Sequence, residues 1–427
     1  MPRFHVQNFG CRASQADGAA IESGLIREGL ERTADSAEAE LVVLNSCTVT
    51  SSADEDIRKT IHRVHRENPA ARILVTGCYA QRAPEELAAI PGVHWVVGNS
   101  HKAKIPEIVA ESSAPYHGQI HIGDIFEQHD FLGAPVEEAA GDRTRPNLKI
   151  QDGCNNRCSF CIIPFVRGRS RSAPAEQVIY QVRDLAAKYR EVVLSGINLG
   201  RWGREQGRGM HLADLIRRIL DETSVERLRL SSVEPMDWSD DLLGLVAESP
   251  RIAKHVHAPL QSGSDGVLRR MHRKYRPRHY EDRIQKARAW MPDAAIGADV
   301  MVGFPGETDA EFEDSRQFMA DLPFTYLHVF TYSERPGTPA AEDAAQVPMK
   351  VRKDRNRVLR ELAAAKNLAF RESMAGQTLS AVTLHDTGTA LSGNYLKVEL
   401  ATPREANRLV DLRIGGITAA GVREAAA

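Results

Sequence analysis

Short apolar runs alternate with longer polar segments along most of the chain, which predicts an α/β protein. The first three runs lead directly into Cys11, Cys47 and Cys78, so they recur at spacings of 36 and 31 residues. Helix-like segments lie between them. Such spacings are typical of βαβ units in a parallel sheet. We therefore predict a parallel-sheet α/β domain at the N-terminus.

Six further strand-like runs occupy the middle of the chain, and polar, helix-compatible segments such as 175–189 and 309–321 separate them. This alternation predicts a partial (β/α)6 barrel, open on one side to admit a large substrate. The six runs are 148–151, 191–194, 227–230, 254–257, 295–302 and 326–331.

After Arg371 the pattern changes to short strand-like runs with glycine turns, which predicts a small β-barrel. These runs are 378–383, 389–392, 395–400, 409–414 and 416–422. We expect an N-terminal domain over 1–118, a linker over 119–142, a central core over 143–366 and the C-terminal barrel over 369–427. The linker prediction rests on an acidic, irregular stretch that contains Glu137, Glu138 and Asp142.

Composition agrees with an ordinary soluble protein of 427 residues, in which 55 Lys and Arg face 57 Asp and Glu. No apolar run approaches the roughly 18 residues of a membrane span, and the first residues lack a signal-peptide core. We expect a cytoplasmic protein without a membrane partner. Cysteines are kept reduced there and more often bind metal or do chemistry than pair.

Three of the six cysteines form a tight set, Cys154, Cys158 and Cys161, with Cys-x3-Cys-x2-Cys spacing. An iron–sulfur cube normally takes four thiolates, so three would leave one iron open to an exogenous molecule. The set follows a strand-like segment, at the strand end where α/β proteins build their sites. The alternative is a zinc knuckle with a distant fourth ligand, or a structural loop.

The other three cysteines, Cys11, Cys47 and Cys78, each end an apolar run. Because the carboxyl ends of parallel strands share one sheet edge, these thiols can converge. We hypothesise a second three-thiolate cluster, against the alternative of three unrelated core thiols. Iron analysis near eight rather than four irons per chain would support two clusters.

The tight set, with Phe160 as the aromatic residue before its last cysteine, resembles the radical S-adenosylmethionine superfamily. With the scattered set placed N-terminal to it, the chain is similar to the methylthiotransferases within that superfamily. Further stretches resemble the same family: Asn45-Ser-Cys47-Thr-Val-Thr50, Gln151-Asp-Gly-Cys154, Ser231-Ser-Val-Glu-Pro235, Pro259-Leu-Gln-Ser-Gly-Ser264 and Val302-Gly-Phe-Pro-Gly-Glu307. The resemblance implies two [4Fe-4S] clusters and S-adenosylmethionine, whose reductive cleavage gives a 5′-deoxyadenosyl radical.

Turns after the central strands hold glycines and polar residues suited to a cofactor site, and Glu234 or Asn198 could hold its ammonium or ribose hydroxyls. Taken singly, each residue could equally be a turn glycine or a helix cap. Beyond the cluster ligands, no catalytic residue is predicted. The predicted cofactor-binding residues are Phe160, Ser195, Gly196, Asn198, Ser232, Glu234, Gln261 and Gly303.

The resemblance also implies an RNA-binding TRAM domain at the C-terminus. From Met374 onward, however, five Lys or Arg face five Asp or Glu, so a strong phosphate grip by this region alone is not expected. Basic runs lie over 269–278 and 350–357, and their alternative is a solvated helix face. The predicted RNA-binding residues are Arg167, Arg169, Arg269, Arg270, Arg273 and Lys274.

Within the family, several stretches look closest to the branch that acts on N6-threonylcarbamoyladenosine at position 37 of tRNA. The same chemistry on N6-isopentenyladenosine in tRNA, or on an aspartate of a ribosomal protein, is the alternative. A different class is an iron–sulfur electron-transfer or RNA-binding protein without turnover. Besides the tRNA anticodon stem-loop, the expected partner is an electron donor such as a flavodoxin or ferredoxin. The oligomeric state is not predicted.

Overall fold

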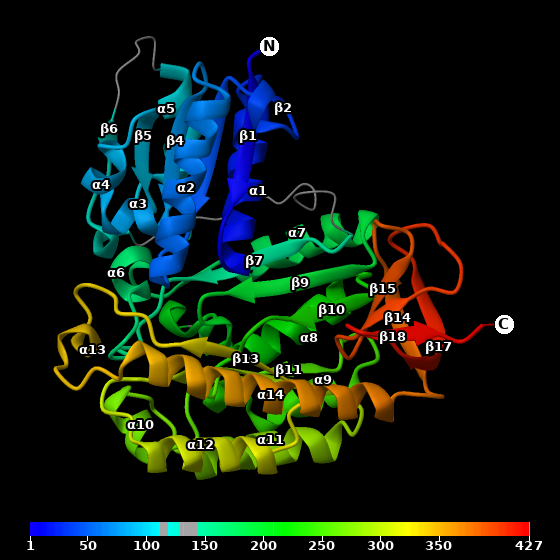
Figure 1. Cartoon of the computed structure of the whole chain (residues 1–427). Coiled ribbons are helices and arrows are strands. Elements are labelled where there is room, and N and C mark those ends of the chain that lie inside the picture. Colours follow the sequence, from blue (N-terminus) through cyan, green and yellow to red (C-terminus); the bar gives the residue numbers. More distant parts are fainter. Residues whose placement is uncertain (112–117, 129–130, 132–143, 208, 427) are drawn as a thin grey trace.

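The computed structural model describes residues 1–111, 118–128, 131, 144–207 and 209–426. An N-terminal sheet, a central barrel-like part and a small C-terminal barrel follow one another along the chain (Figure 1). The predicted fold class is therefore confirmed. Within the described residues, no helix is both long and apolar enough to span a membrane.

The N-terminal sheet is entirely parallel, with the strand order β2-β1-β3-β4-β5-β6. Alternate residues of its strands fill two apolar cores, one on each face. Helix α2 (Ser51–Glu67) covers one face, while α1 (Arg12–Arg27) and α5 (Ile105–Glu111) cover the other. The strands are β1 (Arg3–Asn8), β2 (Glu31–Arg32), β3 (Leu41–Ser46), β4 (Arg72–Gly77), β5 (Val93–Gly98) and β6 (Gln119–His121).

Six parallel strands form the central part, in the order in which they occur along the chain. They belong to two sheets, and a parallel bridge from Leu228 to Ile252 marks the transition between them. The six strands are β7 (Asn147–Asp152), β9 (Glu191–Gly196), β10 (Arg227–Leu230), β11 (His255–His257), β12 (Ala295–Val302) and β13 (Tyr326–Thr331). Short β8 (Arg171–Ser172) joins the outer edge of β7 antiparallel.

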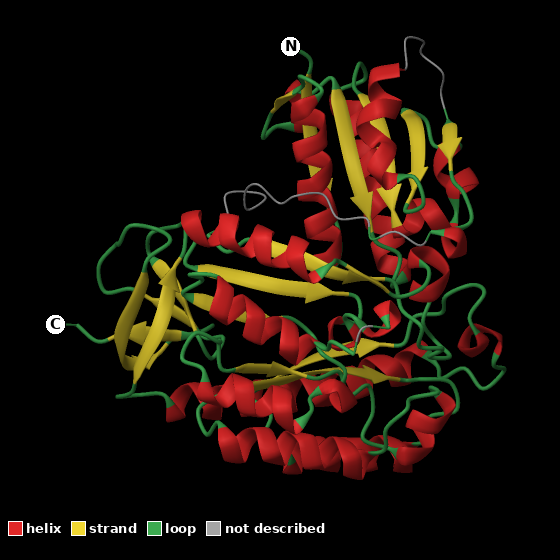
Figure 2. Cartoon of the chain, turned by 180° about the vertical axis from the view of Figure 1, so that it is seen from behind, coloured by secondary structure: helices red, strands yellow, loops and turns green. Residues whose placement is uncertain are grey.

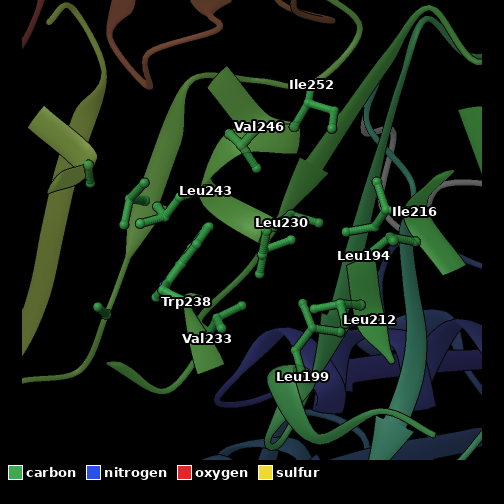
Figure 3. Packing of buried hydrophobic residues seen from close by; sticks show 14 of the residues in the cluster. Leu194, Leu199, Leu212, Ile216, Leu230, Val233, Trp238, Leu243, Val246 and Ile252 are labelled. Carbon is green, nitrogen blue, oxygen red and sulfur yellow. The ribbon is translucent and has the colours of Figure 1, made fainter. Parts of the chain in front are cut away.

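Alternation along these strands separates an apolar outer face from a polar inner one. Leu194 of β9 and Leu230 of β10 point outward and pack with residues of the covering helices, among them Ile216 and Val246 (Figure 3). The outer helices are α7 (Ala175–Lys188), α8 (Leu212–Glu222), α9 (Asp240–Glu248), α11 (Pro277–Trp290), α12 (Asp309–Asp321) and α14 (Met349–Ser373). On the inner face His328 and Asp299 keep 51% and 29% of their side chains exposed, and the space that they border is called the lumen below. No pairing joins β13 back to β7 among the described residues.

Five strands close the C-terminal barrel in the order β14-β15-β16-β18-β17. Its core includes Ala295 from the start of β12 and Phe370 and Met374 from the end of α14, so the barrel docks at the amino ends of the central strands (Figure 2). The strands are β14 (Thr378–Thr383), β15 (Thr389–Ser392), β16 (Lys397–Glu399), β17 (Leu409–Ile417) and β18 (Val422–Glu424).

Some predicted boundaries differ from the structure. The linker predicted over 119–142 begins with β6, which is the sixth strand of the N-terminal sheet. Residues 129–130 and 132–143, with Glu137, Glu138 and Asp142, lie outside the described residues. The boundary predicted between 366 and 369 falls inside α14, because this helix continues unbroken to the barrel. The run predicted over 416–422 is mostly a turn between β17 and β18.

Candidate functional site: two thiol sets beside a polar lumen

Cys154, Cys158 and Cys161 lie on the loop between β7 and α6 (Ile163–Arg167). Gly153 has φ +68°, and a Cβ there would lie 2.0 Å from the carbonyl oxygen of Arg169, so only glycine fits this turn. The Cys161 amide donates to the Cys158 carbonyl at 3.1 Å. The loop thus gathers its three thiols at the carboxyl end of β7.

The chemistry of these thiols fits a metal cluster. Burial raises the pKa of Cys161 to about 12, and neighbouring Cys158 and Cys154 add to the effect. Three thiolates at this position therefore need a strongly positive group, which the iron of a cluster supplies. Donors also face the sulfurs, since Asn198 Nδ2 lies 3.6 Å from Cys154 Sγ and Arg273 Nη1 lies 3.2 Å from Cys158 Sγ.

Cys11, Cys47 and Cys78 converge at the carboxyl edge of the N-terminal sheet, after β1, β3 and β4 respectively. Burial raises the pKa of Cys47 to about 12, with contributions from Cys78 and Cys11. A Cβ at Gly10 would lie 2.9 Å from Cys47 Sγ, so the loop that carries Cys11 closes directly over Cys47. The sequence argument from parallel strand ends predicted this convergence.

The two thiol sets are connected through α6, which begins two residues after Cys161. Ile162 and Val166 pack against Cys78 in a small apolar cluster. Asn99 Nδ2 joins the same contact, because it donates to Val166 O at 2.7 Å and lies 3.6 Å from Cys78 Sγ. One short helix of the central part therefore forms a wall of the N-terminal thiol site.

A buried network of charges surrounds Arg167 at the end of α6. Its guanidinium donates to Asp152 Oδ1 at 2.9 Å and to Asp17 Oδ2 of α1 at 3.0 Å. Lys149 contacts both carboxylates, and Lys102 donates to Asp17 at 2.9 Å. Burial lowers the pKa of Arg167, but Cys78, Asp152 and Asp17 together raise it well above its ordinary value.

Two predicted RNA-binding residues are therefore corrected. Arg167 is 1% exposed and lies within this network, so it does not present its charge to an RNA backbone. Arg273 is also buried, and besides contacting Cys158 it donates to Glu234 at 2.5 Å. Counting cations along a sequence cannot distinguish an inward side chain from an outward one.

The remaining predicted cations lie nearer the surface. Arg169 and Lys274 are exposed, and exposed Arg269 pairs with Asp265 at 2.8 Å. Arg270 is half-buried and bidentate to Glu311, at 2.9 and 2.8 Å. Arg352 and Arg355 of the basic run 350–357 are buried. Arg352 donates to the carbonyl oxygen of Tyr332, and Arg355 donates to the carboxylate of Glu307.

Among the predicted cofactor residues, Asn198 and Glu234 lie closest to the tight thiol set. Asn198 Oδ1 is buried without a hydrogen-bond partner among the described residues. The nitrogen of the same side-chain amide, Nδ2, lies 3.6 Å from Cys154 Sγ. Glu234 reaches Cys158 through Arg273. A small hollow adjoins Glu234, and its lining residues are Asn156, Cys158, Arg201, Glu234, Met236, His272, Arg273, Lys274 and Tyr275.

The other predicted cofactor residues have structural contacts as well. Phe160 packs edge-on against Phe304, with ring centroids 6.4 Å apart, and Ser195 Oγ donates to Leu148 O at 3.4 Å. Gly303 has φ +72° and donates its amide to Glu307 at 2.7 Å. The remaining positions are turn residues at strand ends: Gly196 lies against Gln151, Ser232 is half-buried after β10, and Gln261 has φ +65° and bridges to Val300.

The lumen carries a group of polar and aromatic side chains that the sequence argument missed. Asp299 Oδ1 lies 3.3 Å from His257 Nε2 and 3.1 Å from His328 Nδ1. Burial raises the pKa of Asp299, but the hydrogen bonds from both histidines lower it below its usual range. The alternation of polar residues along 255–257, 295–302 and 326–331 was the available signal, since inward residues recur at every second position.

The floor of the lumen comes from the C-terminal barrel. Tyr395 stacks on His255 of β11 with ring centroids 4.4 Å apart and an interplanar angle of 15°. His255 Nε2 in turn lies 2.6 Å from the hydroxyl of Tyr326 on β13. The lumen is therefore bounded by the cysteine loop at the carboxyl ends of the strands and by Tyr395 at the amino ends.

Comparisons with known proteins agree with this arrangement. Residues 3–98 match the model of "Uncharacterized protein family UPF0004", and residues 148–319 match that of the radical SAM superfamily. The fold is similar to that of the radical S-adenosylmethionine methyltransferase TsrM from Kitasatospora setae, solved with cobalamin and a [4Fe-4S] cluster bound. The TM-score is 0.55 at 15% identity, and the match covers 80% of this chain and 77% of that chain.

Curated relatives match over most of the chain. Threonylcarbamoyladenosine tRNA methylthiotransferase MtaB of Aquifex aeolicus is 35% identical over 96% of this chain and 99% of that protein. The protein of the same name in Bacillus subtilis is 41% identical over 82% of this chain and 78% of that protein. tRNA-2-methylthio-N(6)-dimethylallyladenosine synthase of Syntrophomonas wolfei is 33% identical over 83% and 80%. With this identity along nearly its whole length and a radical SAM core, the chain belongs to the radical S-adenosylmethionine methylthiotransferase family.

Proposed function

We propose that this enzyme adds a methylthio group to C2 of N6-threonylcarbamoyladenosine at position 37 of tRNA. The observation that carries the proposal is the juxtaposition of two three-thiol sets, joined by α6, beside a lumen with aromatic walls. Several relatives are named for threonylcarbamoyladenosine in tRNA, which supports N6-threonylcarbamoyladenosine as the substrate base. Other relatives are named for N6-dimethylallyladenosine.

The family's cofactors are [4Fe-4S] clusters and S-adenosylmethionine. When bound, they supply radical chemistry and the transferred sulfur, which side chains cannot supply because an aromatic C–H is far too weak an acid for any of their bases. We assign one cluster to Cys154, Cys158 and Cys161 and the other to Cys11, Cys47 and Cys78. Asn198 and Arg273 donate toward the sulfurs of the first set.

Residues of the lumen account for binding of the base. Rings that stay partly exposed in the lumen, such as Tyr326 and His328, offer surfaces on which a splayed-out purine can stack, the common mode for single-stranded RNA. Tyr395 of the C-terminal barrel covers the amino ends of the strands, which limits the access of water to a reactive intermediate from that end. A flavodoxin or ferredoxin is the proposed electron donor.

Nucleoside mass spectrometry of tRNA tests the proposed substrate. In a strain that lacks this gene, the 2-methylthio derivative of N6-threonylcarbamoyladenosine should disappear and the unmodified nucleoside should accumulate. The 2-methylthio derivative of N6-isopentenyladenosine should persist in the same digest as an internal control. Loss of that second nucleoside instead would assign the enzyme to the other tRNA branch, and no change in either would contradict a tRNA substrate.

Exposed cations beside the hollow should contribute to tRNA affinity. Lys274 and Cys158 both line the hollow, and exposed Arg278 is the second residue of the neighbouring helix α11. Lys274→Ala and Arg278→Ala should each weaken tRNA binding and reduce the slope of log K against log salt by about one. Filter binding over a salt series measures both quantities.

Arg183→Ala on the outer helix α7 is the matched control, since Arg183 is also exposed. It should leave affinity and slope unchanged. If all three variants bind with the same salt slope as the wild type, the surface beside the hollow is not the tRNA-binding face.

A further inference from the structure

Among the residues that the structure describes, the floor of the lumen carries more cations than carboxylates. Glu191 is fully buried, and it lies 2.7 Å from Arg229, 3.2 Å from Arg145 and 3.7 Å from Arg227. Arg227 also interacts electrostatically with Asp411, which is exposed on the C-terminal barrel. Three guanidinium groups thus share two carboxylates before any further cation is counted.

Arg12 is that further cation. It is the first residue of α1 and directly follows the thiol ligand candidate Cys11. Its carbonyl oxygen accepts a 2.5 Å hydrogen bond from Asn147 Nδ2 at the start of β7, which fixes this end of α1 against the central strands. Its electrostatic influence reaches Arg145, His255 and Tyr326, so the guanidinium faces the lumen floor.

No carboxylate partner of Arg12 occurs among the described residues. The only polar contact found for its guanidinium there is with the hydroxyl of Tyr395, to which Nη2 donates at 3.4 Å. The side chain is half-buried, whereas the other arginines of the floor are held by Glu191. A half-buried cation among other cations is costly unless an anion joins it.

The surroundings of Arg12 are rigid and flat. Tyr395 has φ +66° and is held between His255, 4.4 Å away, and the guanidinium of Arg229, 5.5 Å from its ring centroid. The Tyr326 ring covers Gly297, where a Cβ would lie 1.9 Å from the ring. Such a wall accepts a planar group beside the guanidinium.

We infer that Arg12 forms a carboxylate-binding subsite that takes the threonyl carboxylate of the N6 substituent. This inference rests on the proposed function. A guanidinium pairs with a carboxylate through two parallel N–H···O bonds, which gives both strength and orientation. A dimethylallyl substituent has no charge and would leave Arg12 unpaired, so the same residue disfavours that substrate.

The test uses the reconstituted enzyme with both clusters and two synthetic anticodon stem-loops. One carries N6-threonylcarbamoyladenosine, and the other carries its carboxamide analogue, in which a neutral amide of nearly the same shape replaces the carboxylate and one acceptor oxygen becomes an NH2 donor. For the wild type, the carboxamide should lower kcat/KM by about 10- to 100-fold, the range of a hydrogen bond to a charged group. Arg12→Met should lower kcat/KM for the natural stem-loop by a similar factor and no longer distinguish the two substrates.

Controls separate recognition from cluster damage. Arg27→Met, at the exposed opposite end of α1, should behave as the wild type. Arg12→Met should keep its iron content and its formation of 5′-deoxyadenosine in the presence of dithionite, and Arg12→Lys should restore part of the discrimination. If Arg12→Met loses its cluster, the wild-type comparison of the two stem-loops still decides whether the carboxylate is recognised.

The outcomes also distinguish the two proposals. A wild-type enzyme that fails on the natural stem-loop contradicts the proposed function. A wild-type enzyme that modifies both stem-loops equally well, or an Arg12→Met variant that retains the full preference for the carboxylate, overturns the Arg12 inference and leaves the proposed function intact.

Discussion

Replacement of Arg167 by methionine is expected to lower the free energy of unfolding by about 3–5 kcal/mol. The guanidinium is 1% exposed and hydrogen-bonded to both Asp17 and Asp152, which lie on different parts of the chain. Methionine fills much of the same volume, so the loss comes from two buried carboxylates that each lose a charged donor.

The same substitution should also reduce the iron bound by the N-terminal thiol set, because Arg167 lies close enough to Cys78 and Cys11 to interact electrostatically with both. Urea unfolding of the full chain and iron analysis after anaerobic reconstitution measure the two effects. Arg169→Met is the matched control, since Arg169 lies two residues away and is exposed. It should change stability by no more than about 0.5 kcal/mol. Equal stability of the two variants would show that the network is not what holds this interface.

Removal of one thiol set should abolish methylthiolation while the other set keeps its iron. The triple variant with alanine at Cys11, Cys47 and Cys78 is expected to retain about four of about eight irons per chain. It should still form 5′-deoxyadenosine from S-adenosylmethionine with dithionite as reductant. We expect this activity to persist because the residues around Cys158 belong to the central part and not to the N-terminal domain.

The reciprocal triple variant, with alanine at Cys154, Cys158 and Cys161, should also bind about four irons but form no 5′-deoxyadenosine. Each variant is the control for the other, as the chain has no further cysteine. Methylthiolated product from the first variant would mean that its thiols are not needed for sulfur transfer. Loss of 5′-deoxyadenosine from both would mean that the two sets do not act independently.

Much of the fold was predictable, because strand-like runs carry a local signal. The runs predicted at 378–383 and 389–392 coincide with β14 and β15, and the six central strands lie where alternation placed them. The convergence of the scattered cysteines also followed from a local rule, namely that parallel strands end at one sheet edge.

What sequence could not supply was the direction of long charged side chains and their distant partners. Arg167 meets Asp17 across 150 residues of chain, and nothing in the basic stretch around Arg167 reveals that carboxylate. Likewise, Tyr395 belongs to a short turn of the C-terminal barrel, and only the docking of that barrel places it against His255. Such contacts depend on how separately folded parts meet.

Through Tyr395, the C-terminal barrel contributes to the lumen of the central part. One of its turns forms the floor of the lumen, and the carbonyl oxygens of Ser392 and Gly393 accept hydrogen bonds from Arg229. Exchanging this barrel for that of a relative would therefore change the shape of the lumen floor, although the barrel lies outside the central strands. A substitution in the turn that carries Tyr395 would likewise act on the central part, so the two parts are not independent in this architecture.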